Sequence, residues 1–311
     1  MCLLLDRRKG DAVTTYVIRS SAEHSSVAPV TRVARIDNWR VNVPDEAWLI
    51  DRIVQDVLDG RGGTVFTINL DHLAKLRSDG AFRAAYQRAS YISADGMPVV
   101  MLARSEGVPL ERVTGADLVV PLSRAAAAAG IPVHFFGTRT DILGRAVDRL
   151  RREVPGLIVA GIEAPPMGFD PVGEDARAAA ERISASGAGI CFVALGAPKQ
   201  EIFANAALTH SDGVVYIGVG AALDFLAGER SRAPRFMQRS GLEWLWRSFQ
   251  EPRRMMPRYL RSGLWLVGYV LRLALGITRE TSAPVEVPVE PRVGRDPSVA
   301  VSAVPARETA R

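Results

Sequence analysis

The chain has 311 residues, of which 48% are hydrophobic, and this excludes a fibrous or wholly disordered protein. The net charge of +5 is uneven: residues 229–261 hold nine arginines and three glutamates, a local +6, which leaves −1 for the rest. Such a basic segment favours nucleic acid, an anionic membrane surface or a phosphorylated substrate as partner. Two cysteines, Cys2 and Cys191, cannot form a disulfide framework, and the apolar run at residues 3–5 is too short for a secretory signal. We therefore expect a cytoplasmic protein.

Both ends of the sequence differ from its middle. Residues 1–35 lack sustained periodicity and predict a flexible leader, whereas residues 279–311 predict a disordered, proline-rich tail that buries too little apolar surface to offset its chain entropy. Between them we expect an α/β core at 36–228 and an arginine-rich helical appendage at 229–278.

Strand and helix patterns alternate through the predicted core. The expected helices are 73–89, a helix from 96, 118–129, 138–153 and a helix from 199. The expected strands are 63–69, 91–95, 132–137, 157–161, 190–195 and 213–218. This alternation predicts an α/β fold, a Rossmann-like and mostly parallel sheet with helices on both faces.

The appendage predicts two helices, 241–250 and 258–277, with Pro252 and Pro257 breaking the path between them. The apolar span 263–277 reaches only about 22 Å, shorter than the ~30 Å hydrocarbon core of a bilayer. One interpretation is a helix in the membrane interface, with arginines towards the headgroups and Trp265 and Tyr269 at the boundary. The alternative is a helix packed on the domain or on another subunit.

Residues typical of ligand sites follow several of the predicted strands. In open α/β sheets the binding crevice lies beyond the carboxyl ends of the strands. Several of these residues also have a structural interpretation: Thr67 and Asn69 can pair within the sheet or cap, and Asp95 and Asp224 can cap helices. Glu201 is expected to start a helix rather than to act in catalysis. The candidates are Thr67, Asn69, Asp95, Gly137, Gly196, Pro198, Lys199, Gln200, Gly218, Gly220 and Asp224.

Several cofactor and metal motifs are absent from the sequence. No Gly-x-Gly-x-x-Gly follows the first strand and no Gly-x-x-x-x-Gly-Lys-Ser/Thr occurs, which argues against NAD binding and excludes a P-loop NTPase. The four histidines are scattered without zinc spacing, and no Asp-x-Asp occurs. We expect no cofactor and no metal, so arginines would have to neutralise any phosphate.

An ordered series of motifs makes the sequence resemble one enzyme family. The motifs are Thr67-Ile-Asn69, Ala94-Asp-Gly96, Arg112-Val-Thr-Gly-Ala-Asp117, Phe135-Phe-Gly137, Leu195-Gly-Ala-Pro-Lys-Gln-Glu201, Gly218-Val-Gly220 with Asp224, and the run 228–259. Over residues 40–260 the chain strongly resembles the WecG/TagA/CpsF family of bacterial glycosyltransferases, glycosyltransferase family 26.

The resemblance implies an inverting, metal-independent transfer from a UDP-sugar, of N-acetylmannosamine or glucose type, to a polyprenyl-diphosphate-linked acceptor. Such products feed cell-surface polysaccharides. The enzyme would be peripheral on the inner face of the cell membrane, with a possible homo-oligomer and no nucleic-acid partner. By similarity Asp95 takes the position of the catalytic base with Thr67 beside it, and the appendage supplies Arg247, Arg254 and Arg258, with Arg253 an alternative to Arg254.

The chemistry of these residue types agrees with that reaction. A carboxylate can deprotonate the acceptor hydroxyl as it attacks the anomeric carbon, a general-base gain of ~10²–10⁴-fold. Guanidinium groups bind phosphate oxygens bidentately and stay protonated, so they can compensate the leaving diphosphate or hold that of the acceptor. A non-catalytic scaffold of a polysaccharide assembly complex is the alternative function, and the donor sugar, acceptor glycan and oligomeric state are not predicted.

Overall fold

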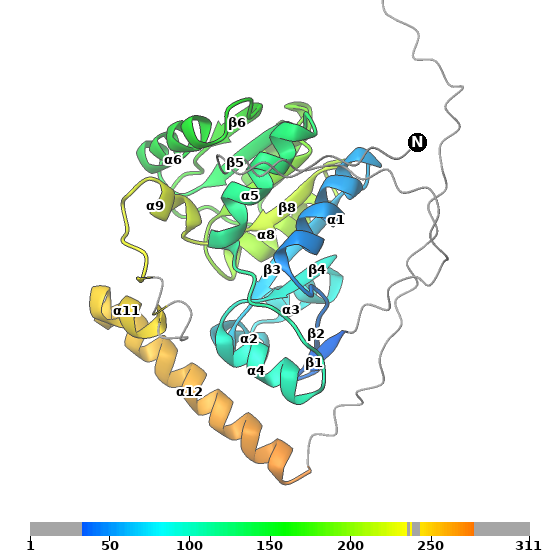
Figure 1. The fold of residues 1–311 in the computed structure, drawn as a ribbon. Helices are drawn as coiled ribbons and strands as arrows, with labels where there is room; N and C mark the ends of the chain where they lie inside the picture. The colour runs from blue at the N-terminus through cyan, green and yellow to red at the C-terminus, as the bar shows by residue number, and fades with distance from the viewer. Residues whose placement is uncertain (1–32, 235–236, 238–242, 277–311) are drawn as a thin grey trace, which may run out of the picture. The chain divides into compact units, whose positions relative to one another are not determined.

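The computed structural model describes residues 33–234, 237 and 243–276 (Figure 1). Nearly all of the predicted leader and all of the predicted tail lie outside these residues. Within them, a six-stranded sheet has the order β4-β3-β8-β7-β5-β6, and all of its strand pairs are parallel. The strands are β3 (Gly63–Ile68), β4 (Tyr91–Ala94), β5 (Val133–Gly137), β6 (Val159–Glu163), β7 (Ile190–Ala194) and β8 (Val215–Gly218). All six predicted strands are confirmed, with β6 two residues later than expected.

Helices cover both faces of this sheet, as predicted, because successive strand residues feed two separate cores. Phe136 packs in one core with Cys191, and Phe135 packs in the other with Phe192. The first core is covered by α2 (Leu70–Leu76), α3 (Gly80–Arg88), α4 (Met97–Ser105), α7 (Glu174–Ala185) and α8 (Lys199–Ala207). The second is covered by α1 (Glu46–Leu58), α5 (Gly115–Ala128), α6 (Thr140–Glu153) and α9 (Ala222–Leu226). A sheet buried on both faces explains the continuous apolar strands.

A small hairpin precedes the core and was not predicted. Strands β1 (Ala34–Ile36) and β2 (Trp39–Val41) pair antiparallel through a turn at Asp37 and Asn38, which both have positive φ. A two-residue turn of this kind matches the twist of the flanking strands. Ala34 and Ile36 are fully buried, so the last residues of the expected leader belong to this hairpin.

The prediction of one continuous helix at 73–89 is wrong, because the structure has two helices there, α2 and α3. Asn69 caps α2 by accepting a hydrogen bond from the backbone N–H of His72, at 3.0 Å. Asp79 caps α3 in the same way, accepting from the backbone N–H of Phe82 at 2.9 Å. The cap at Asp79 starts a second helix and so divides the apolar pattern.

The appendage contains α11 (Glu243–Gln250) and α12 (Pro252–Ala274). The expected break at Pro257 is wrong, since α12 runs from Pro252 through Pro257. Pro252 occupies the first turn, where its missing N–H has no helical partner to lose. Pro257 lies near the start of the helix, so it removes one hydrogen bond without ending the helix. In the described part of the chain, no helix is long and apolar enough to cross a membrane.

Helix α12 lies beside α2 (Figure 1) and packs one face into the first core. Of the two interpretations left open for this helix, Trp265 and Tyr269 fit packing on the domain and not the membrane boundary. Their rings stack at 5.0 Å, and they are only 6% and 0% exposed. Tyr269 Oη accepts a hydrogen bond from the backbone N–H of Asp37, at 3.3 Å. The appendage is therefore docked on the domain. Its apolar side chains on the other side are exposed: Met256, Leu260, Leu264, Val267, Val270, Leu271 and Leu275.

Candidate active site

Asp95 and Asn69 meet at the carboxyl ends of β4 and β3. The backbone N–H of Asp95 donates to the carbonyl of Ile68 at 2.8 Å, which fixes the residue after β4 beside the end of β3. Asn69 Nδ2 then donates to Asp95 Oδ2, at 3.2 Å. Asp95 is partly buried, and the Asn69 amide is a side-chain donor to its carboxylate. The structure thus brings together two of the predicted site residues.

Thr67 precedes Asn69 on β3 and is 7% exposed. Its carbonyl accepts from Tyr86 Oη at 2.7 Å and lies 2.8 Å from His72 Nδ1. Tyr86 and His72 also contact each other, at 2.9 Å. Burial, followed by the charges of Glu201 and Asp95, raises the pKa of Tyr86, so its hydroxyl remains a donor. These buried contacts of Tyr86 and His72 with the carbonyl of Thr67 hold the end of β3 in place.

The end of β5 and the residue after it contact Ala194, the last residue of β7. Gly137 has φ +125°, and a Cβ there would lie 2.6 Å from the carbonyl oxygen of Ala194, so only glycine fits. Thr138 donates its backbone N–H to that carbonyl at 3.0 Å. Its Oγ1 donates to Asp224 Oδ1 at 2.8 Å. Asp224 is therefore bound to the neighbouring strand-end loop.

The loop between β7 and α8 holds the predicted residues Gly196, Pro198, Lys199 and Gln200. Gly196 has φ +74°, and the bond between Ala197 and Pro198 is cis. Lys199 Nζ donates to the carbonyl of Phe169 at 2.8 Å, so the lysine is held by a loop of the same domain. Gln200 is 3% exposed and points into the protein.

Gln200 connects this loop to the end of β8. Its Oε1 accepts from the backbone N–H of Gly220, at 3.0 Å. A Cβ on Gly218 would lie 2.9 Å from Gln200 Nε2, so glycine leaves the room that this amide needs. Gly218, Gly220 and Gln200 are thus brought together as a packed unit.

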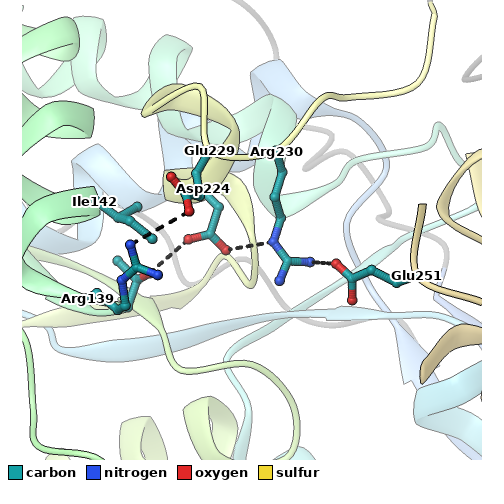
Figure 2. A pocket seen from close by; sticks show the side chains of 7 residues that line it. Arg139, Ile142, Asp224, Glu229, Arg230 and Glu251 are labelled. Carbon is teal, nitrogen blue, oxygen red and sulfur yellow. Dashed lines mark hydrogen bonds and ion pairs between the residues drawn. The ribbon is translucent and has the colours of Figure 1, made fainter. Parts of the chain in front are cut away.

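A pocket of about 390 Å³ opens beside these loops (Figure 2). Arg230 lies between two carboxylates: its Nε is 3.6 Å from Asp224 Oδ2, and its Nη1 binds Glu251 Oε1. Glu251 directly precedes α12, so the pocket joins the core to the appendage. The lining residues are Thr138, Arg139, Ile142, Asp224, Glu229, Arg230 and Glu251.

A second arginine bridge lies at the start of α5. Asp117 Oδ2 is 3.0 Å from Arg112 Nη2, and Asp117 Oδ1 is 2.6 Å from Arg232 Nη2. Arg112 also lies 4.0 Å from Glu243 of α11. The motif at residues 112–117 therefore anchors the segment that leads to the appendage.

Arg258, the third arginine predicted to bind phosphate, pairs with Asp71 in the first turn of α2. Asn69 caps this helix and also contacts Asp95, so the appendage reaches the same helix start as the candidate base. Arg247 lies in α11 and Arg254 in α12, and their side chains lie outside the described residues.

No group of three or more histidine, cysteine, aspartate or glutamate side chains that could hold a metal ion occurs among the residues described here. The polar groups of the pocket alternate between guanidinium donors and carboxylate acceptors. Such a lining can bind hydroxyl groups through its carboxylates and phosphate oxygens through its arginines.

The sequence analysis did not single out Arg139, Glu229, Arg230 or Glu251 as site residues. Arg139 and Arg230 each follow a candidate closely, since Arg139 comes two residues after Gly137 and Arg230 six residues after Asp224. That proximity was a usable signal. Glu251 lies in the run 228–259 that carries the family resemblance, but its place beside the pocket depends on how α12 docks.

Together, a parallel sheet with helices on both faces and polar side chains at its strand ends place the chain in the α/β class of proteins. The sequence model described as "Glycosyl transferase WecG/TagA/CpsF family" matches residues 34–280. The chain belongs to this family of glycosyltransferases. The match includes the hairpin, the whole sheet and α12, so the docked appendage is part of the family's common region.

Proposed function

We propose that this glycosyltransferase moves a sugar from a UDP-sugar to a polyprenyl-diphosphate-linked acceptor, with inversion and without a metal ion. The proposal continues the family assignment, which supports sugar transfer in cell-surface polysaccharide synthesis. The observation that carries it is the convergence of Asp95, Asn69 and the Arg258–Asp71 pair on the start of α2. A carboxylate base and a cation that can bind diphosphate thereby reach one helix start.

In the proposed reaction Asp95 takes the proton of the acceptor hydroxyl. The hydroxyl oxygen forms the new bond to the anomeric carbon while the bond from that carbon to UDP breaks, and UDP leaves from the opposite face. Asn69 orients the carboxylate through its 3.2 Å contact. Thr67 lies beside this centre on a strand end held by Tyr86 and His72.

The donor nucleotide is proposed to occupy the pocket around Asp224. Strands β4 and β8 are separated by β3 alone, so about 10 Å lies between the strand that leads to Asp95 and the strand that leads to Asp224. An elongated nucleotide-sugar can span this distance. Asp224 and Thr138 supply groups for a ribose or base, and Arg139 and Arg230 supply donors for phosphate oxygens.

Neutralisation of the leaving diphosphate is assigned to arginines. The sequence has no Asp-x-Asp for a diphosphate-bound cation, and it has 39 cationic side chains, of which only three are lysines. Arginine suits this task because its planar donors match phosphate oxygens and it stays charged. We propose Arg258 for this role, together with Arg247 and Arg254 from the sequence analysis.

The acceptor is proposed to be met at a membrane surface, on its cytoplasmic side. Helix α12 buries Trp265 and Tyr269 on the domain and leaves an apolar stripe exposed, with Leu260, Leu264 and Leu271 between 56% and 68% exposed. A helix with an apolar stripe and flanking arginines binds the interface of an anionic bilayer.

The test is a donor screen with a short-chain prenyl-diphosphate-linked sugar, followed by mass spectrometry of the lipid product. We expect UDP release and a mass gain of one hexose-type residue, in EDTA as in buffer. Asp95→Asn is the control for background hydrolysis. Turnover that EDTA abolishes would contradict the metal-free mechanism. Failure of every UDP-sugar with intact UDP binding would favour a scaffold.

A further inference from the structure

Gln200 and Glu201 form a buried side-chain pair beneath the strand ends. Gln200 Nε2 donates to Glu201 Oε1 at 2.9 Å, while Gln200 Oε1 accepts from the Gly220 backbone at 3.0 Å. Both side chains are almost inaccessible, at 3% and 0% exposure. The single amide therefore uses its donor end on one residue and its acceptor end on another.

Glu201 is unusual because it is an acidic residue with no exposed surface and no salt bridge among the described residues. Its second oxygen, Oε2, is buried without a hydrogen-bond partner. Burial raises the pKa of Glu201, and the charge of His72 and the hydrogen bond from Gln200 offset this only in part. A buried acid is costly to keep unless its hydrogen bond does something that an apolar side chain could not.

The hydrogen bond from Gln200 supplies that reason. An amide can rotate to exchange its oxygen and nitrogen, and the two ends have nearly the same shape. The backbone N–H of Gly220 needs the oxygen end. Glu201 accepts only from the nitrogen end, so it selects the rotamer in which the oxygen faces Gly220.

We propose that Glu201 is a positioning residue that sets the orientation of the Gln200 amide and, through it, the conformation of the loop at residues 219–221. This loop follows β8 and leads to Asp224. Gly220 has φ +56°, so the loop has a tight bend at the point where Gln200 holds it. Losing this hydrogen bond frees the bend.

The same pair connects two parts of the site. Gln200 supports the β8 end, and the charge of His72, which contacts the carbonyl of Thr67 under the β3 end, acts on Glu201. The pair therefore lies between the loop of Asp224 and the strand of Thr67. The consequence for donor binding rests on the proposed function, whereas the effect on the loop does not.

The experiment compares three variants of the full-length protein by amide hydrogen exchange, read on peptides covering 214–226. Glu201→Gln keeps an acceptor oxygen for Gln200, and Glu201→Leu keeps volume without an acceptor. In the double variant Gln200→Glu with Glu201→Gln, the side-chain hydrogen bond is restored in the opposite direction, because the amide at position 201 donates to the carboxylate at position 200. That carboxylate still accepts from the backbone N–H of Gly220. The single variant Gln200→Glu is its control, because it puts two buried carboxyl groups together with no amide donor between them.

We expect the exchange rate at Gly220 to rise at least about 10-fold in Glu201→Leu. A 10-fold rise corresponds to a loss of about 1.4 kcal/mol in the free energy of opening. Exchange in Glu201→Gln should stay within about 3-fold of the parent, and exchange in the double variant should fall below that in Gln200→Glu. Peptides from α6, on the other side of the sheet, report general destabilisation. Equal protection at Gly220 in Glu201→Leu and the parent would overturn the proposal. An exchange rate that rises equally in all peptides, including those from α6, would overturn it as well. If Glu201→Leu does not fold, the comparison of the double variant with Gln200→Glu decides alone.

A second measurement is titration with UDP. We expect the dissociation constant to rise about 10-fold in Glu201→Leu and to stay near the parent value in Glu201→Gln. If the parent does not bind UDP, the proposed donor is wrong and the exchange result still stands. If the parent binds UDP and all variants bind equally, the consequence for donor binding is overturned, and the exchange result alone decides whether the loop depends on Glu201.

Discussion

Arg258 Nη2 lies 2.6 Å from Asp71 Oδ2, and this ion pair fastens α12 to the first turn of α2. Lys75 Nζ binds the same carboxylate oxygen at 2.7 Å. An arginine proposed to bind diphosphate is therefore held by a core carboxylate. Binding a phosphate would exchange one anionic partner for another, so the position of α12 and the charge of the substrate are coupled through Asp71.

The Asp71 cluster predicts an acid-dependent loss of stability. Burial raises the pKa of Asp71, but hydrogen bonds from Arg258 and Lys75 outweigh it and lower the pKa to about 2. The pKa is lower in the folded state, so the stabilisation is present above about pH 4 and is lost as pH falls towards 2. We expect Asp71→Asn to lower the unfolding free energy by about 2 kcal/mol at pH 7 and to differ less from the parent at each step down from pH 4.

Urea unfolding at several pH values measures this. Asp141→Asn is the matched control: its pKa is also lowered to about 2, first by the hydrogen bond from Arg139, but this pair is exposed and screened by solvent. A constant difference between parent and Asp71→Asn from pH 7 to pH 2 would contradict the assignment.

Asp95 is the candidate base, and Asp95→Asn should reduce transfer by ~10²–10⁴-fold, because an amide cannot take the acceptor proton. Donor affinity should change little, since the pocket around Asp224 is untouched. Initial rates and calorimetric titration with UDP measure the two quantities separately. Near-normal turnover in Asp95→Asn would remove this residue as the base.

Asp224 is predicted to act in donor binding. Asp224→Asn removes a charged partner of both Thr138 and Arg230, so UDP affinity should fall by about 10-fold. Asp212→Asn is the control, because Asp212 is exposed on the loop before β8, at the amino end of that strand. The measurement is UDP titration of each variant. Equal losses in the two variants would point to a non-specific charge effect.

The exposed stripe of α12 is predicted to bind anionic vesicles. Replacing Leu260, Leu264 and Leu271 by serine should weaken binding by at least about 10-fold, because each leucine contributes apolar area to the interface. The melting temperature should change little, since these side chains are already exposed. Co-sedimentation with vesicles containing phosphatidylglycerol measures binding, and Leu58→Ser on α1, which is 57% exposed, is the control. Unchanged sedimentation would show that another surface contacts lipid.

The sequence predicted the sheet because a doubly covered parallel strand is an uninterrupted apolar run, as at residues 190–194. It also predicted the strand-end candidates, and the contact of Asn69 with Asp95 follows from two adjacent strands. The hairpin turn at Asp37 and Asn38 and the cap at Asp79 depend on turn and capping residues, which the spacing of apolar residues does not reveal.

Other features could not have been predicted from local pattern. Arg230 and Glu251 are 21 residues apart, and Arg258 and Asp71 are 187 apart. Each pairing depends on the docking of α12, which is decided by burial of Trp265 and Tyr269 in the first core. A helix with apolar residues on two sides gives no sign of which side faces the domain.

The arginine pairs at the junction have a consequence for how the protein responds to ionic strength. Arg230, Arg232 and Arg258 are partners of carboxylates and are 24–34% exposed, so dissolved ions reach them. Screening weakens such pairs over a Debye length of about 8 Å at 0.15 M salt and about 3 Å at 1 M. The burial of Trp265 and Tyr269 of α12 in the first core does not depend on charge and is not weakened by salt in this way. High salt concentration should therefore weaken the contacts of residues 229–234 with the core, while α12 stays packed on the domain.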